Sequence, residues 1–307
     1  MTERPESLPG GQDKQARVLP RPLQAGGADL HLHSWYSDGT WAPTEVVSRA
    51  AHLGLNPIAL TDHDTVGGIA EARRAGSEFG IEVIPGVELS ARDRGREIHL
   101  LGYFIDWKDP QLSVRLHRLT DERQARLNAI LARLQDLGIP LTRHEVEHLG
   151  SRGTIGRLHV ARALVARGAV ASIEEAFSRY LGHGKPAHVE HSDLGPEEAI
   201  GLLRQVGGVP VLAHPGHGFI SLLPQLVAAG LAGLEVHHPS HSPEKILLLL
   251  QAASKFGLVV TGGSDCHGLA KGEPLIGRTR LGPDHVAALR ARWRRETRRR
   301  SRSATTE

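Results

Sequence analysis

The sequence has a single cysteine, Cys266, among 307 residues, and few aromatic residues, 4% of the total. One cysteine excludes an internal disulfide and a zinc site built from several thiolates. No apolar run is long enough to cross a bilayer, and residues 1–27 lack the apolar segment of a signal peptide. We therefore expect a cytoplasmic protein with no membrane partner, no obligate protein partner and a flexible leader at 1–27.

Positive and negative residues are nearly balanced along the chain, and a large excess of one sign occurs only near the C-terminus. Residues 290–302 contain eight arginines and one glutamate, a local charge of +7, which leaves the rest of the chain at −4 for a net charge of +3. We predict that this Arg-rich tail, residues 289–307, is a solvated or disordered arm, with an RNA-contacting arm as the alternative. With 40% hydrophobic and 23% charged residues, the remainder is typical of a globular domain.

Strand-like and helix-like segments alternate with short connections, which indicates an α/β fold built on parallel strands. Pro43 and Gly54 mark the ends of one helix, at residues 43–53, and a second is expected at 68–79. The expected strands number seven: residues 28–33, 57–61, 81–87, 97–104, 209–213, 233–236 and 258–262. We predict a barrel formed by residues 28–107 and 190–288, interrupted by a helical insertion at 108–189.

Histidines and carboxylates gather at the ends of these strands. His31 and His33 alternate on the first strand, so both imidazoles project to the same side, and Asp38 follows on the next turn. In a barrel of parallel strands, the carboxyl ends of the strands line the active-site mouth. Nine such residues occur in all: His31, His33, Asp38, His63, Glu88, His99, His214, Asp265 and His267.

This donor set predicts a cluster of metal ions. Imidazoles mixed with carboxylates suit divalent zinc, manganese or iron, and nine ligands are too many for one ion. Glu88 and Asp265 are suited to bridging, so we expect two or three metals. Such a cluster hydrolyses phosphate esters by activating water and stabilising the leaving oxygen.

The motifs resemble the PHP (polymerase and histidinol phosphatase) family. The resemblance covers about residues 28–280 and is carried by His31-x-His33, Ser37-Asp38-Gly39, Thr61-Asp62-His63-Asp64, Gly86-Val87-Glu88, Ala213-His214-Pro215 and Ser264-Asp265-Cys266-His267. It implies a distorted (β/α)7 barrel with a metal cluster at its mouth. The helical insertion and residues 182–186 resemble the bacterial subgroup that removes the 3′-phosphate of nucleoside 3′,5′-bisphosphates and trims short RNA from the 5′ end.

That resemblance also implies roles for individual residues. His31, His33, Glu88 and Asp265 would hold one metal; Glu88, His99 and His214 a second; and Asp38, His63 and His267 a third, with manganese expected and iron(II) or zinc as alternatives. The attacking hydroxide would bridge metals held by Glu88 and Asp265, supported by His63 and His267. Substrate contacts would come from Arg157, His159, Lys185 and His241. The sequence departs from the subgroup at His217, where an arginine is usual.

Three other interpretations remain open. An amidohydrolase-type barrel also begins with H-x-H, but no expected strand end offers its bridging lysine. A non-catalytic nucleotide-binding module, or the proofreading-type domain of a polymerase, would not need the complete ligand set. Histidinol phosphate hydrolysis is the nearest alternative within the family.

Overall fold

The fold is built on one seven-stranded sheet whose strand order follows the chain from β1 to β7. The computed structural model describes residues 26–148, 153–190, 194–216 and 218–303, so most of the expected leader lies outside the described residues, as does His217. The strands are β1 (Asp29–Leu32), β2 (Ile58–Leu60), β3 (Val83–Asp93), β4 (Arg96–Tyr103), β5 (Val209–Leu212), β6 (Gly233–His237) and β7 (Val259–Gly262). The sheet curls until Leu32 forms a parallel bridge with Cys266, just beyond β7.

The sheet is mixed, which corrects the expectation of parallel strands throughout. β4 runs antiparallel to both β3 and β5, whereas the other neighbouring pairs are parallel. A tight hairpin joins β3 to β4, because Arg94 and Gly95 both adopt positive φ angles, 46° and 81°, as a two-residue turn requires. β3 also continues to Asp93, so Glu88 lies within this strand and not at its end.

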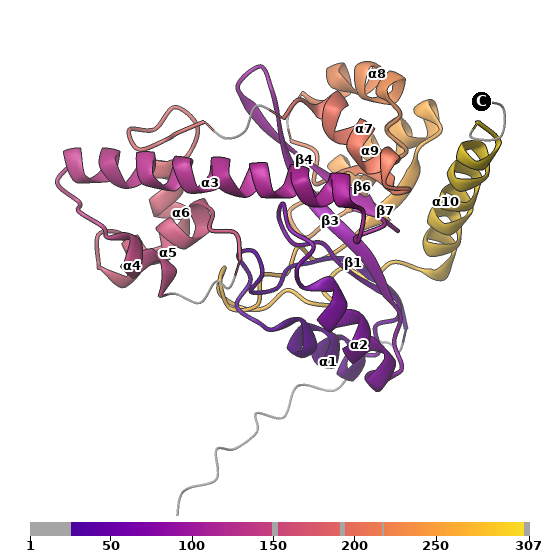
Figure 1. The fold of residues 1–307 in the computed structure, drawn as a ribbon, viewed down its shortest axis with the longest axis horizontal. Coiled ribbons are helices and arrows are strands. Elements are labelled where there is room, and N and C mark those ends of the chain that lie inside the picture. Colours follow the sequence, from indigo (N-terminus) through magenta and orange to yellow (C-terminus); the bar gives the residue numbers. More distant parts are fainter. Residues whose placement is uncertain (1–25, 149–152, 191–193, 217, 304–307) are drawn as a thin grey trace, which may run out of the picture.

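Helices cover the outside of the sheet (Figure 1). They are α1 (Pro43–His52), α2 (Ile69–Phe79), α7 (Pro196–Gln205), α8 (Phe219–Ala229) and α9 (Pro243–Phe256). Proline occupies the first turn of α1, α7 and α9, where its missing N–H costs no helical hydrogen bond. The largest apolar core lies between the sheet and α7, α8 and α9.

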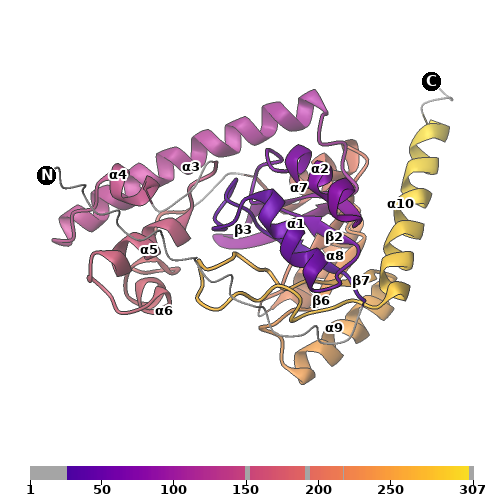
Figure 2. The same ribbon diagram turned by 90° about the horizontal axis from the view of Figure 1, so that it is seen from below.

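The expected insertion is helical and has a core of its own. It contains α3 (Pro110–Asp136), α4 (Arg143–Glu147), α5 (Arg157–Ala166), α6 (Ile173–Ala176) and a short π-helical turn, η1 (Phe177–Leu181). Asp109 begins α3 by accepting hydrogen bonds from the backbone N–H groups of Gln111 and Leu112. Leucines in the first part of α3 pack in the core of the sheet, and those in its second part pack in the core of the insertion. One helix therefore joins the two parts, which lie side by side in Figure 2.

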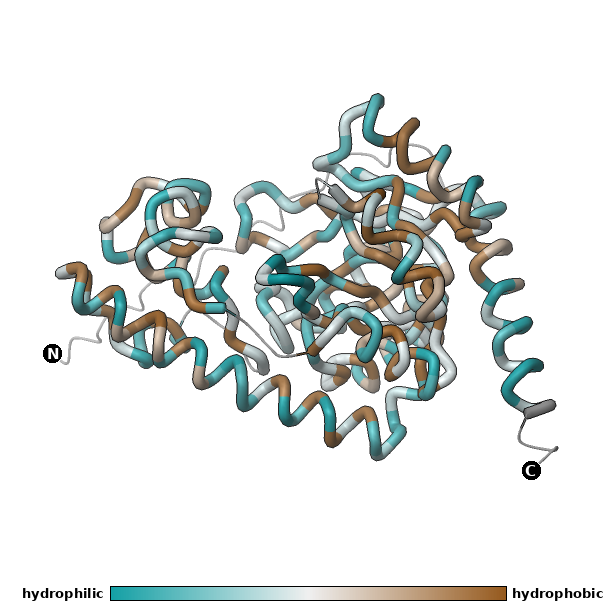
Figure 3. Tube along the Cα trace, turned by 90° about the horizontal axis from the view of Figure 1, so that it is seen from above, coloured by the Kyte–Doolittle hydropathy of each residue, from teal (hydrophilic) through white to brown (hydrophobic). Residues whose placement is uncertain are grey.

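The Arg-rich tail is a helix within the described residues, so of the predicted solvated or disordered arm the disorder is wrong there, while its distal residues are mostly exposed. α10 (Pro283–Ser303) packs Val286 and Leu289 into the core inside the sheet, and the Trp293 ring stacks on Phe104 with centroids 4.9 Å apart. Figure 3 shows its colour change from apolar to hydrophilic toward the C-terminus. α10 contacts β5 and β7. It lies at the end of the molecule away from the insertion (Figures 1 and 2).

No helix among the described residues is both long enough and apolar enough to span a membrane.

Candidate metal centre

The side chain of Glu88 lies at the centre of the predicted ligands and is fully buried. Its Oε2 atom lies 3.1 Å from His31 Nε2, 3.2 Å from His33 Nε2 and 3.3 Å from His63 Nδ1. Its Oε1 atom lies 2.9 Å from His99 Nδ1 and 3.0 Å from His214 Nε2. Both oxygens of one carboxylate thus face imidazoles from different strands.

The backbone places these groups together through close strand contacts. Glu88 N donates to Asp62 O, and Asp64 N donates to Glu88 O, so the end of β2 runs beside the middle of β3. Gly263, the residue after β7, lies so close to β1 that a side chain there would collide with His31. Asp265 and His214 both have positive φ angles, a strained conformation for residues other than glycine that often accompanies functional sites.

Three groups of donors have ligand atoms within 4.8 Å of one another. The first is His31, His33, Glu88 and Asp265; the second is His63, Glu88 and His99; the third is His33, Asp38, His63 and His267. The first group is the first set named from the sequence. The second group has His63 in place of His214, which was expected there and which lies 3.0 Å from Glu88 Oε1. The third group contains the whole third set expected from the sequence, with His33 added.

The donor set fits divalent metal ions. Four buried donor atoms of the cluster, His33 Nε2, Asp38 Oδ1, His63 Nδ1 and His267 Nε2, make no aligned hydrogen bond among the described residues, although each lies within 3.3 Å of a potential partner. Buried polar atoms without partners are costly, and metal coordination removes that cost. Imidazole nitrogens and carboxylate oxygens are the donors that zinc, iron and manganese accept.

Protonation compensates for charge in the metal-free cluster. Burial alone would lower the pKa of His33, but the Asp265 and Glu88 carboxylates raise it to about 9. Burial is likewise outweighed at His99, where Glu88 and Glu97 raise the pKa to about 10. Burial would raise the pKa of Glu88, yet the surrounding imidazoles hold it well below its usual range. Ligation of a metal ion by His33 or His99 would therefore displace a proton.

A second layer of carboxylates orients the imidazoles. Glu235, fully buried on β6, lies 2.9 Å from His31 Nδ1 and accepts a 2.7 Å hydrogen bond from the His214 backbone N–H. Glu97 lies 3.0 Å from His99 Nε2. Neither was predicted, although the sequence carries a signal for each: Glu235 is the one charged residue of a buried strand, and Glu97 alternates with His99 on β4.

Cations surround a cleft of about 220 Å³ between the donor cluster and the insertion, lined in part by Arg123, Arg126, Arg157 and Lys271. Arg123 is buried and donates from Nε to Asp64 Oδ2 at 2.7 Å, which fixes α3 to the end of β2. Lys271 Nζ lies 3.1 Å from Asp265 Oδ2. The side of the cleft formed by the insertion includes Phe177.

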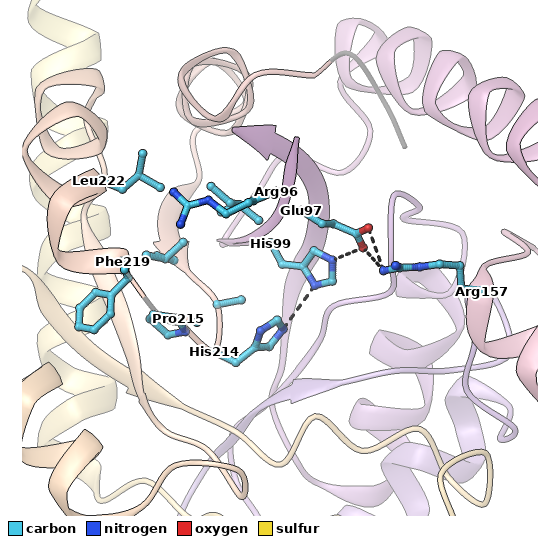
Figure 4. A pocket seen from close by; sticks show the side chains of 13 residues that line it. Arg96, Glu97, His99, Arg157, His214, Pro215, Phe219 and Leu222 are labelled. Atoms are coloured by element: carbon cyan, nitrogen blue, oxygen red, sulfur yellow. Dashed lines mark hydrogen bonds and ion pairs between the residues drawn. The ribbon is translucent and has the colours of Figure 1, made fainter. Parts of the chain in front are cut away.

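The four expected substrate contacts have different surroundings. Arg157 lines the cleft, but its Nη2 atom bonds both oxygens of Glu97 at 2.9 and 2.8 Å (Figure 4). His159 is fully buried, and its Nδ1 accepts from Gly156 N at the start of α5. His241 is buried and bonds Val236 O through Nδ1. Lys185 is exposed after η1 and does not line the cleft.

Comparison with known proteins agrees with this geometry. The PHP domain model matches residues 29–184. The chain belongs to the PHP family. It is 37% identical to a 3′,5′-nucleoside bisphosphate phosphatase of Chromobacterium violaceum over 82% of this chain and 90% of that protein.

Two further relatives lie in the same family. A 5′-3′ exoribonuclease of Haemophilus influenzae is 38% identical over 78% of this chain and 89% of that protein. A solved structure from Bifidobacterium adolescentis, of a protein assigned as a metal-dependent phosphoesterase, superimposes with a TM-score of 0.80 at 34% identity. That match covers 88% of this chain and 97% of the other.

Proposed function

We propose that this protein is a metal-dependent phosphoesterase that removes the 3′-phosphate of nucleoside 3′,5′-bisphosphates and shortens small RNA from the 5′ end. The buried Glu88 carboxylate carries the proposal, because it faces five imidazoles with its two oxygens. The relatives named as a bisphosphate phosphatase and an exoribonuclease support the choice of substrate.

The donor groups would supply ligands to two or three divalent ions. His31, His33, Glu88 and Asp265 would hold one ion. Glu88, His63, His99 and His214 would hold a second, and Asp38 and His267 would complete a third with shared imidazoles. Manganese is the ion we expect. When bound, such ions polarise phosphoryl oxygens and lower the pKa of coordinated water.

The remaining residues of the cleft bind and orient the substrate. Arg126, Arg157 and Lys271 bring positive charge to the cleft, which favours a ligand with two phosphates. Arg157 would exchange its bonds to Glu97 for bonds to a phosphate, since a guanidinium binds phosphate oxygens in the same paired geometry. Leu158, Ile173 and Phe177 limit the access of water from the side of the insertion.

A substrate panel with added manganese tests this assignment. Phosphate or nucleotide release would be compared for adenosine 3′,5′-bisphosphate, 5′-phosphorylated short RNA, adenosine 5′-monophosphate and histidinol phosphate. We expect the highest kcat/KM for the bisphosphate or the RNA. A preference for histidinol phosphate would contradict the substrate and keep the reaction class, whereas no turnover of any compound would contradict both.

A further inference from the structure

A second hollow adjoins the metal centre, between His99, His214 and α8. Its volume is about 280 Å³, and it lies between the start of β4, the turn after β5 and the first part of α8. His99 and His214 form one side of it, and their rings are 5.1 Å apart. Glu97, His99 and Arg157 line both this hollow and the cleft, so the two spaces meet at these residues (Figure 4).

The wall opposite the histidines is apolar. Leu212, Phe219 and Leu222 line it, and all three belong to the core between the sheet and the outer helices. Ile98 adds a partly buried side chain from β4. Figure 4 shows Phe219 and Leu222 on the α8 side and His99 and His214 on the other. An apolar wall beside convergent polar groups is typical of a site for a small organic ligand.

Arg96 stands at the rim of this hollow. Its guanidinium lies 3.4 Å from Asp93 Oδ2 across the β3–β4 turn, and its side chain is 53% exposed. A Cβ on Gly218 would lie only 3.2 Å from Arg96 Nη1, so the guanidinium spans the space between β4 and the start of α8. A planar guanidinium stacks well on aromatic rings, including nucleobases.

We propose that this hollow is the subsite for the nucleobase of the substrate, with the base between the Arg96 guanidinium and the apolar wall of α8. The inference rests on the proposed function, since a phosphate held beside His99 and His214 leaves the rest of the nucleotide next to this space. The apolar surface of a base would contact the apolar wall, and its planar face would stack on the Arg96 guanidinium at the rim. A purely charged ligand such as a sugar phosphate would leave the apolar wall uncovered.

Gly216 provides the first test. It lines the hollow, and a Cβ built on it has no heavy atom within 4 Å, so Gly216→Leu adds bulk without strain in the backbone. The measured quantity is the KM for adenosine 3′,5′-bisphosphate divided by that for ribose 3,5-bisphosphate, which lacks the base. We expect this ratio to rise roughly 5- to 150-fold, the range for loss of one base-stacking contact.

Gly201→Leu is the matched control, because Gly201 lies on α7 and also has open space around its Cβ position. Its KM ratio should equal that of the wild type. An unchanged ratio in Gly216→Leu would overturn the subsite, as would an equal rise in both variants.

Arg96 provides a second test that separates stacking from charge. Arg96→Ala and Arg96→Lys should both raise the KM ratio if the planar guanidinium covers the base. A normal ratio in Arg96→Lys together with a raised ratio in Arg96→Ala would contradict stacking, because only the charge would then matter.

Ligand binding to the manganese-loaded protein distinguishes failure of this inference from failure of the proposed function. Calorimetric titration should show tighter binding of adenosine 5′-monophosphate than of ribose 5-phosphate, and Gly216→Leu should remove the difference. Equal binding of the two compounds by the wild type would overturn the base subsite even if the enzyme hydrolyses nucleotides. A clear preference that Gly216→Leu removes would support it even if turnover fails.

Discussion

At the scale of single residues, the Glu235 and Glu97 carboxylates orient the imidazole rings of His31 and His99. Glu235 lies 2.9 Å from His31 Nδ1 and also bonds the His214 backbone. A carboxylate on one ring nitrogen directs the other nitrogen toward a metal and makes it a stronger ligand. The same holds for Glu97 and His99 on β4.

Replacement of Glu235 tests this role. Glu235→Gln keeps the size and one acceptor but removes the charge, so manganese affinity should fall roughly 10- to 100-fold. Titration of the metal-free protein measures it. Glu198→Gln, at an exposed position of α7, is the control and should bind as the wild type does. Unchanged affinity in Glu235→Gln would show that the carboxylate only fills space.

His159 links one residue to the pH dependence of stability. Burial lowers its pKa to about 4, below the ordinary value of about 6.5, so the folded protein favours the neutral ring. The unfolded chain takes up the proton first as the pH falls. The free energy of unfolding should therefore decrease by about 3 kcal/mol between pH 6.5 and pH 4 because of this residue.

His159→Gln is the matched variant, because Gln at this third helical position can still bond the backbone N–H that precedes the helix but does not titrate. Urea unfolding at several pH values measures the difference between the two proteins. The variant should lose less stability on acidification, and parallel curves would contradict the assigned pKa.

At the scale of elements, α3 fixes the position of the insertion. Arg123 on this helix bonds Asp64 Oδ2 and Ser90 Oγ, and Arg123 and Asp64 are both buried. The leucines of the same helix enter two separate cores. Arg157 on α5 contacts Glu97 on β4, so the substrate contact proposed for Arg157 would depend on this junction.

Removal of Arg123 tests the junction. Arg123→Met leaves the Asp64 carboxylate buried without its cation, which should lower the free energy of unfolding by about 3–5 kcal/mol. Arg118→Met, on the exposed side of the same helix, should change it by less than about 0.5 kcal/mol. Chemical denaturation of both variants provides the comparison, and equal stabilities would show that the buried pair does not hold α3.

The sequence predicts the elements better than their directions. The seven strands were expected near their observed positions, because apolar runs at 209–213 and 258–262 identify buried strands. The direction of β4 was not predicted, because the pattern of its apolar residues is the same for a parallel and an antiparallel strand. The two-residue turn at Arg94 and Gly95 makes β4 antiparallel to β3. Val286, Leu289 and Trp293 recur at the spacing of an amphipathic helix. The prediction for this segment rested on its many arginines, and the helical spacing of these apolar residues was overlooked.

The clustering of the candidate donors was predictable for a different reason. His or carboxylate side chains directly after an apolar run stand out in sequence, as His214 does after 209–213. Glu235 on β6 contacts His31 on β1, and the order of the strands, which the sequence does not state, brings the two together. Glu97 lies two residues before His99 on the same strand, so this contact follows from the sequence once β4 is known to be a strand.

At the scale of the whole molecule, metal binding by the donor cluster would be coupled to the release of protons. The pKa values of His33 and His99 are raised to about 9 and about 10, so both rings carry protons at pH 7.5 without metal. Ligation requires neutral imidazole. Manganese binding should therefore release protons, and more of them than unperturbed histidines would.

Calorimetric titration in two buffers with different heats of ionisation measures the number of protons released. His99→Asn should release about one proton fewer than the wild type. Binding heats that do not depend on the buffer would contradict the protonated cluster.

The central claim is that the nine clustered donors carry out phosphate ester hydrolysis. The most direct measurement is phosphate release from adenosine 3′,5′-bisphosphate with manganese by the wild type, His63→Ala and Asp265→Asn, with Asp284→Asn on exposed α10 as control. We predict a loss of roughly 100-fold or more in the first two variants, since even residues behind the ligands cost 10- to 100-fold, and no loss in the control. Equal rates in all four proteins would place the reaction elsewhere.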